Sequence, residues 1–194
     1  HCASRKATSH QARESDSAAH LKNGVPVMHK EHVYIGLGSN LGDSGALLEA
    51  ACSEMAALDQ TRVLARSSVY GSSPMGPQDQ PDYLNAVCLL ETSLEPLTLL
   101  HQLQRIEKEH GRERKAERWG PRTLDLDILL YGNVEMNTEE LTLPHYGMPE
   151  REFVMVPLFE IAPSMIMPDG NPIALWVSRC NLDGLRRLTP STQA

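Results

Sequence analysis

Four short apolar runs predict the main strands of this protein. They lie at residues 32–37, 62–70, 83–94 and 124–130, and each is rich in leucine, β-branched or aromatic residues. Turn-forming residues follow every run, as is typical of strands that are buried on at least one face. A weaker run at 134–136 predicts one further short strand.

Two stretches between these runs have apolar residues at every third or fourth position, which is the pattern of an amphipathic helix. The first begins at Ser44, which can cap a helix N-terminus, and continues to about Leu58. The second begins at Pro96, a residue suited to the first helical turn, and ends at Gly111. Each of these helices is expected to bury one face.

The C-terminal third has a less regular pattern. Residues 153–158 fit either a strand or a short helix, and the tail at 173–188 predicts one or two short helices. The complete order is strand, helix, strand, long loop, strand, helix, basic loop, strand and a final mixed region. This order predicts an α+β sandwich, for which the ferredoxin-like plan is the nearest simple template.

A glycine-rich sequence, GLGSNLG, lies between the first strand and the first helix. It does not match the dinucleotide fingerprint GxGxxG, because Leu41 stands where the third glycine would be needed. We interpret the segment 38–43 as a tight turn from strand to helix. The alternative is a backbone segment that lines a ligand.

Residues 1–30 are polar, rich in serine, alanine and histidine, and without periodicity. We expect a flexible N-terminal extension or an expression remnant here, followed by a single domain at 31–194. The alternatives are an organelle presequence and a histidine metal-binding tract, although these histidines stand about ten residues apart. A content of 41% hydrophobic residues is ample for a core in a chain of this length.

Composition narrows the class of function. The formal net charge of −7 argues against general binding of nucleic acid or of an anionic membrane, and no apolar run is long enough to cross one. The four cysteines form no CxxC pair. This predicts free thiols in a reducing compartment and argues against a structural zinc site. We therefore expect a cytoplasmic protein.

The fourth apolar run carries two carboxylates, Asp125 and Asp127. Side chains alternate along a strand, so both carboxylates point to one face while Leu126 and its apolar neighbours point into the core. Their backbones are about 6.6 Å apart, and like charges so close to a core need compensation. A hard divalent cation such as Mg²⁺ provides it. The alternative is a solvated edge strand with a salt bridge to Arg122.

A basic segment precedes this strand, although the whole chain is acidic. Its cations are Arg112, Arg114, Lys115, Arg118 and Arg122. Such a run is most often a solvated surface. Beside a candidate metal site, however, arginine gives forked contacts to phosphate and lysine a movable positive charge. The segment therefore indicates a polyphosphate site, in which the nearby tryptophan either covers a base or packs within the loop.

Two further segments carry polar side chains able to contact a ligand. Tyr83 and Asn85 share one strand face, where a ring and an amide can stack on and hydrogen-bond to a flat heterocycle. His145, Tyr146 and Arg151 share a loop bounded by prolines, and the arginine offers one more phosphate contact. Structural roles in the core or in turns are the simpler alternative for both groups.

Metal carboxylates, phosphate-binding cations and a heterocycle pocket together indicate phosphoryl or nucleotidyl transfer without a P-loop, because no GxxxxGK[ST] sequence is present. The segments YIGLGSNLGD, GPQDQPDYLNAV, RWGPRTLDLDILLYG, LTLPHYGMPEREF and PLFEIAP closely resemble the 6-hydroxymethyl-7,8-dihydropterin pyrophosphokinases of folate biosynthesis. The resemblance extends from about Val33 to the mid-170s. It implies a ferredoxin-like three-layer αβα sandwich with a mainly antiparallel sheet, and transfer of pyrophosphate from ATP to the pterin hydroxymethyl oxygen, leaving AMP.

The resemblance also implies roles for individual residues. Two Mg²⁺ ions would be bound by Asp125 and Asp127, and Arg112 and Arg122 would act with them in catalysis. The ATP site would consist of Gln104, Glu107, Arg114, Lys115, Trp119, Ile128, Thr142, His145, Tyr146 and Arg151. The pterin ring would stack between two aromatic side chains, and its contacts would be Ser72, Ser73, Met75, Tyr83, Asn85 and Phe153.

Two features depart from the family pattern. The first pterin loop is expected to be a Thr-Pro-Pro type run, whereas this chain has Ser72, Ser73 and Pro74, which keep one hydroxyl but change the loop. The N-terminal extension has no counterpart in the catalytic domain. ATP and the pterin are the expected partners, and we expect a monomer.

Two other classes of function use parts of the same pattern. A metal-dependent phosphodiesterase or nucleotidyltransferase would use the same aspartate pair. A ferredoxin-like RNA-binding module would use the basic segment, but it would need aromatic strand faces and a basic domain. Two phenylalanines and a net charge of −7 count against the RNA-binding class.

Overall fold

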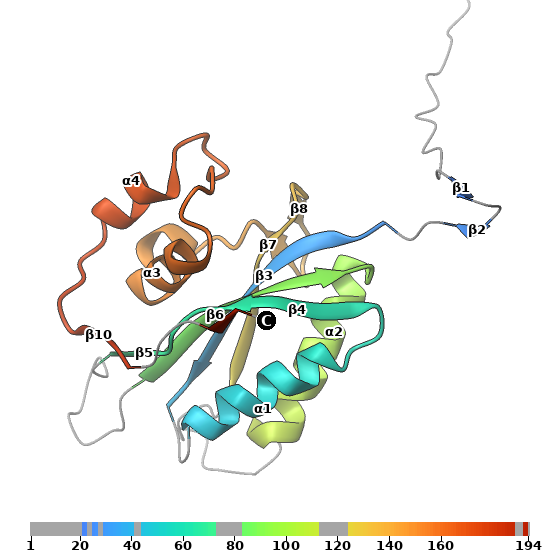
Figure 1. Cartoon of the computed structure of the whole chain (residues 1–194), viewed down its shortest axis with the longest axis horizontal. Coiled ribbons are helices and arrows are strands. Elements are labelled where there is room, and N and C mark those ends of the chain that lie inside the picture. The colour runs from blue at the N-terminus through green and yellow to red at the C-terminus, as the bar shows by residue number, and fades with distance from the viewer. Residues whose placement is uncertain are drawn as a thin grey trace, which may run out of the picture.

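The computed structural model describes residues 21–22, 25–26, 29–40, 44–72, 83–112, 124–188 and 192–193. Within these ranges the helices and strands form three layers. Two helices, α1 and α2, cover one face of a central sheet, and α3 lies against the other face with α4 beside it (Figure 1). The predicted α+β sandwich is confirmed.

The central sheet has seven strands, whose pairings are all antiparallel. They are β3 (Glu31–Ser39), β4 (Thr61–Arg66), β5 (Tyr70–Ser72), β6 (Tyr83–Thr92), β7 (Asp125–Tyr131), β10 (Leu185–Arg187) and β11 (Thr192–Gln193). The order β4, β6, β3, β7 across the sheet, with a helix after β3 and another after β6, is the ferredoxin-like arrangement. Two small hairpins pair β1 (Leu21–Lys22) with β2 (Val25–Pro26), and β8 (Met136–Asn137) with β9 (Thr142–Leu143).

The helices are α1 (Ser44–Ala56), α2 (Pro96–Glu107), α3 (Glu152–Ile161) and α4 (Ile173–Ser178). The first two follow the predicted bounds, except that α2 changes into a π-helical turn, η1 (Lys108–Arg112), before Gly111. The ambiguous segment at 153–158 is helical, and it follows a short 3₁₀ turn, η2 (Met148–Glu150). No helix among the described residues is long and apolar enough to cross a membrane.

Three predicted bounds were wrong in detail. The first strand continues through Gly38 to Ser39, so the glycine sequence begins inside β3 rather than in a turn. The predicted strand at 62–70 is divided into β4 and β5, and at the division the Val87 N–H donates to the side-chain hydroxyl of Ser67 at 2.9 Å. The predicted helical tail contains α4 but ends in strand β10.

Strand β7 contributes alternate side chains to two cores. Leu126 and Ile128 lie in the core between the sheet and helices α1 and α2, whereas Leu129 lies in the core beneath α3. Ordinary alternation explains this, and it puts the aspartates of β7 on the α3 face. A β-bulge follows, since Ile35 pairs with Ile128 while Tyr34 pairs with Leu130, and Leu130 then packs on the same α3 face as Leu129.

Candidate active site

The candidate site lies on the α3 face of the sheet, where three neighbouring strands bring polar residues together. Gly38 of β3 pairs with Asn85 of β6 on one side and with Asp125 of β7 on the other. Directly opposed residues of antiparallel strands share a face, so Asn85 and Asp125 project on the same side of the sheet. Gly36 and Asp127 form the next such pair.

The two glycines leave this face of β3 without side chains. A Cβ atom at Gly38 would lie 3.0 Å from Oδ1 of Asn85, which is tighter than an ordinary contact, and one at Gly36 would lie 3.4 Å from Leu129. β3 therefore presents bare backbone between Asn85 and the two aspartates. Sequence reasoning placed Gly36 in the first strand and Gly38 in a turn, although the spacing of two between these glycines was the signal for a shared strand face.

The aspartate pair lies on the polar side of a strand whose other side is buried. Asp127 is exposed and Asp125 is half-buried, while Leu126 is buried in the core. The described residues contain no group of three or more His, Cys, Asp or Glu side chains arranged for a metal ion. Two carboxylates alone fit Mg²⁺, which commonly takes one or two of them and completes its shell with water and substrate phosphates.

A hollow of about 250 Å³ lies beside Asp127 at the β7 edge of the sheet, between Leu100 of α2, strand β7 and the loop at 138–146. Its apolar walls, which include Leu126 and Ile128, belong to the core under α1 and α2. Five of the predicted metal-binding and ATP-binding residues line this hollow: Asp127, Ile128, Thr142, His145 and Tyr146. They come from two segments that are separated along the chain. The fold therefore brings together residues that were grouped in sequence only by the family resemblance.

His145 is held in a defined orientation at the edge of this hollow. Its backbone N–H donates to the Leu129 carbonyl at 3.0 Å, and its Nδ1 accepts from the Gly147 N–H at 3.2 Å. In the neutral ring Nε2 is then the N–H donor. Burial lowers the pKa of His145; the charge of Asp127 opposes this shift and Arg151 reinforces it.

Aromatic contacts order the other side chains of the same loop. The rings of His145 and Tyr146 stack with their centroids 5.1 Å apart, and Tyr146 remains largely exposed. The guanidinium of Arg151 lies over the Phe153 ring, 5.9 Å from its centroid. Arg151 thus links the loop to the first turn of α3.

Two predicted ATP-binding residues lie on α2, which packs against β7. Gln104 and Glu107 are three positions apart, so they share one side of this helix. Gln104 is exposed, whereas Glu107 is buried. The π-helical turn that follows ends at Arg112.

The described pterin contacts lie at the end of β5, at the start of β6 and in the first turn of α3. Ser72 pairs directly with Tyr83, whose side chain is exposed, and Asn85 follows on the same face of β6 with only 9% of its surface exposed. Phe153 is half-buried in the first turn of α3.

Several predicted residues lie outside the part of the chain that the structure describes. These are Ser73, Met75, Arg114, Lys115, Trp119 and Arg122, together with the side chain of Arg112. Their proposed contacts therefore depend on the family resemblance.

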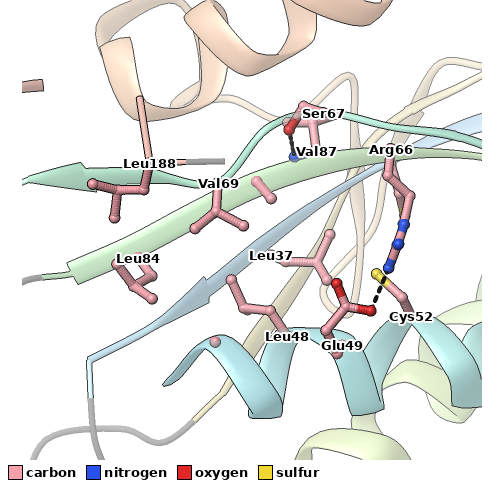
Figure 2. A pocket seen from close by; sticks show the side chains of 13 residues that line it. Leu37, Leu48, Glu49, Cys52, Arg66, Ser67, Val69, Leu84, Val87 and Leu188 are labelled. Atoms are coloured by element: carbon pink, nitrogen blue, oxygen red, sulfur yellow. Dashed lines mark hydrogen bonds and ion pairs between the residues drawn. The ribbon is translucent and has the colours of Figure 1, made fainter. Parts of the chain in front are cut away.

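A larger hollow, of about 510 Å³, opens on the opposite face of the sheet beside α1 (Figure 2). Its walls are mostly apolar, with Leu48 and Leu84 among them, and Arg66 bonds to Glu49 at 2.7 Å on one side. None of the predicted site residues lines it. We therefore take the residues around Asp127, rather than this larger hollow, as the candidate site.

Comparison with known proteins shows the family of the chain. Residues 34–163 match the model of the family described as 7,8-dihydro-6-hydroxymethylpterin-pyrophosphokinase (HPPK). A 2-amino-4-hydroxy-6-hydroxymethyldihydropteridine pyrophosphokinase of Haemophilus influenzae is 52% identical over 157 residues, which cover 81% of this chain and 98% of the relative. The Pseudomonas aeruginosa protein of the same name is 46% identical over 158 residues, covering 81% of this chain and 97% of the relative.

A solved structure of Plasmodium falciparum HPPK-DHPS has the same fold. It superposes with a TM-score of 0.62 at 11% identity, over 78% of this chain and 43% of that longer chain. The likeness at this identity concerns the fold, and the family assignment depends on the sequence matches. The chain therefore belongs to the 7,8-dihydro-6-hydroxymethylpterin-pyrophosphokinase family, which makes it a pyrophosphokinase of folate biosynthesis.

Proposed function

We propose that the β7 edge of the sheet, with the hollow beside Asp127 and the adjoining part of the α3 face, is the active site for Mg²⁺-dependent transfer of pyrophosphate from ATP to 6-hydroxymethyl-7,8-dihydropterin. The acceptor is the hydroxymethyl oxygen, and the products are the pterin diphosphate and AMP. One observation carries the proposal: Asp127, His145 and Tyr146 line one hollow, beside the strand pairing of Asp125, Gly38 and Asn85. The family supplies the reaction, and this arrangement supports the choice of site.

In this proposal Asp125 and Asp127 bind two Mg²⁺ ions. When bound, the ions neutralise charge on the triphosphate and lower the pKa of the attacking hydroxyl. The support is the donor set, since two carboxylates on one strand face leave most coordination positions for phosphate oxygens and water.

The triphosphate binds to the side chains around the hollow. His145 donates from Nε2, Tyr146 from its hydroxyl, and Arg151 offers a forked pair of N–H donors. Arg112, Lys115 and Arg122 complete the phosphate contacts. The remaining ATP contacts are Gln104, Glu107, Arg114, Trp119, Ile128 and Thr142.

The pterin binds next to the aspartates, over the bare backbone of β3. Its ring stacks between Tyr83 and Phe153, and the amide of Asn85 bonds to the polar edge of the ring. Asn85 suits this task because it is nearly buried and held close to Gly38. The segment 72–75 contributes the remaining contacts.

The acceptor hydroxyl attacks the β-phosphorus in line with the oxygen that leaves with AMP. The protein accelerates this step mainly by holding both substrates in register and by placing positive charge where negative charge develops. Neutral His145, whose pKa burial lowers, can donate a hydrogen bond to a phosphate oxygen without needing to be charged.

The deciding experiment supplies ATP, Mg²⁺ and 6-hydroxymethyl-7,8-dihydropterin to the protein and separates the nucleotides. We expect AMP that depends on both the pterin and Mg²⁺. Production of ADP, or AMP without pterin, would contradict the proposed transfer. We further propose that the protein is a cytoplasmic monomer. Size-exclusion chromatography with light scattering tests its oligomeric state.

A further inference from the structure

Glu160 is an acidic residue in an otherwise apolar part of α3, within the sequence PLFEIAP. Only 13% of its side-chain surface is exposed. None of the binding roles described above involves it. Burial of a carboxylate is costly unless its oxygens are hydrogen-bonded, so its partners indicate what it does.

Both carboxylate oxygens of Glu160 accept hydrogen bonds from the segment that leads into β5. Oε2 accepts from the backbone N–H of Ser68 at 2.5 Å, and Oε1 accepts from the Tyr70 hydroxyl at 2.8 Å. Arg187 of β10 is 3.5 Å from Oε1 and donates to the Ser68 hydroxyl at 2.9 Å. One carboxylate therefore joins α3 to two strands at the edge of the sheet.

The bond to Tyr70 is partly buried, and the tyrosine hydroxyl stays protonated. Tyr70 is 6% exposed, and burial together with the Glu160 carboxylate raises the pKa of its hydroxyl to about 12. The hydroxyl thus remains a donor throughout the physiological range. Without this carboxylate, the Ser68 N–H and the Tyr70 hydroxyl would both lose their partner in a buried place.

The two elements that Glu160 joins also carry the two walls of the proposed pterin site. On the sheet side, Tyr70 pairs directly with Asn85, and Ser72 pairs with Tyr83. On the helix side, Phe153 is seven positions before Glu160, which places both on the same face of α3. A contact between Glu160 and β5 therefore fixes the position of Phe153 relative to Tyr83 and Asn85.

We propose that Glu160, through Tyr70 and Ser68, is a positioning residue that sets the geometry of the pterin site. It does not touch the substrate; it holds α3 against β5 so that the aromatic walls and the amide are in register. This inference rests on the proposed function, because it needs the pterin to bind between those walls.

Steady-state kinetics and direct binding of the pterin test the proposal, with Glu160→Gln and Tyr70→Phe as the variants. Glu160→Gln removes the charge and one acceptor, and Tyr70→Phe removes one hydroxyl. We expect each variant to raise the KM and the Kd of the pterin about tenfold, as the loss of one hydrogen bond to a charged group predicts. The KM of ATP should change less than about twofold, because its proposed site lies around β7 and α2.

Glu91→Gln is the matched control. Glu91 is a carboxylate of the same sheet, on β6, but its partners are Lys30 and Arg62 at the other end of that strand. Its replacement should leave both KM values unchanged. The double variant of Glu160 and Tyr70 should be less impaired than the product of the single effects, because both remove the same link.

The outcomes separate this inference from the proposed function. If the wild-type protein yields no pterin-dependent AMP, the proposed function fails. If the wild type is active but Tyr70→Phe and Glu160→Gln keep the pterin KM, or raise both KM values equally, the positioning role is rejected. If Glu160→Gln does not fold, Tyr70→Phe alone tests the positioning role. Tyr70→Phe loses only one oxygen atom.

Discussion

Asp125 and Asp127 share the α3 face of β7 with the glycine positions of the neighbouring strand. Most acidic residues described on this chain meet a cation or lie in solvent, as Glu91 does between Lys30 and Arg62. Asp127 lines a hollow together with a histidine and a tyrosine. Function at the residue scale therefore depends on which polar groups face the same space.

Replacing either aspartate by asparagine should remove the metal site and preserve the fold. We expect Asp125→Asn and Asp127→Asn each to reduce kcat about 100-fold or more, because the triphosphate charge is no longer neutralised. Circular dichroism should be unchanged. Asp183→Asn, at an exposed position before β10, is the control and should retain full activity. Wild-type turnover in either site variant would refute the assignment of metal ligands.

A methyl group at Gly38 tests the need for bare backbone in β3. Its Cβ would lie 3.0 Å from Oδ1 of Asn85, so the amide must move. We expect Gly38→Ala to raise the pterin KM roughly tenfold, a change of about 1.4 kcal/mol, while the ATP KM remains near that of the wild type. Gly45→Ala is the control, since a Cβ there meets no atom within 4 Å. Equal pterin KM values in the two variants would show that Asn85 is not needed in its present place.

Strand β7 shows how one element serves stability and chemistry at once. Its Leu126 side belongs to the core under α1 and α2, and its Asp127 side faces the candidate site. The bulge near Leu129 then turns a second apolar side chain toward α3. The strand can hold carboxylates in place because both cores fix its backbone.

Substitutions on the two sides of β7 should therefore have different effects. Leu126→Ala should lower the free energy of unfolding by about 2–5 kcal/mol, since it leaves a cavity in the core. Under folding conditions it should retain measurable turnover. Asp127→Asn should change the free energy of unfolding little and remove turnover. Urea denaturation measures the free energy of unfolding, and the AMP assay measures turnover. If the less stable of the two variants were also the less active one, the separation of stability and chemistry between the two sides of β7 would be contradicted.

At the scale of the whole molecule, the family match covers residues 34–163, and the candidate site lies within that range. The N-terminal segment at 1–30 contributes none of the predicted site residues. The C-terminal strand β10, which lies beyond the family match, nevertheless pairs with β5 and places Arg187 beside Glu160. We therefore expect the C-terminal strand to affect substrate binding, and the N-terminal segment to have little effect on it.

Removal of residues 1–28 should leave catalysis unchanged. We expect kcat/KM for both substrates to stay within about twofold of the full chain, because a polar segment outside the core contributes little to a packed site. Removal from residue 185 onward should instead raise the pterin KM, since β5 would lose its neighbouring strand. A loss of activity in the first truncation would assign the extension a role and overturn the predicted division at residue 30.

Local pattern predicted most of the fold, because a strand or amphipathic helix is encoded by side chains close to one another in sequence. It placed the two long helices, the central strands and the two-faced character of β7 correctly. It failed at Gly38, where turn-forming chemistry was outweighed by pairing on both sides of β3. It also missed the break between β4 and β5, where the Ser67 hydroxyl accepts the Val87 N–H of β6.

The sequence by itself determined the family, the paired carboxylates on one strand face and the types of group needed for phosphate and pterin. These follow from alternation along a strand and from residue chemistry, which need no partner element. Only the tertiary structure placed Asp127 with His145, Asn85 with Asp125, and Glu160 with Tyr70. Each of these relations joins segments distant along the chain, and strand register and helix packing decide such contacts.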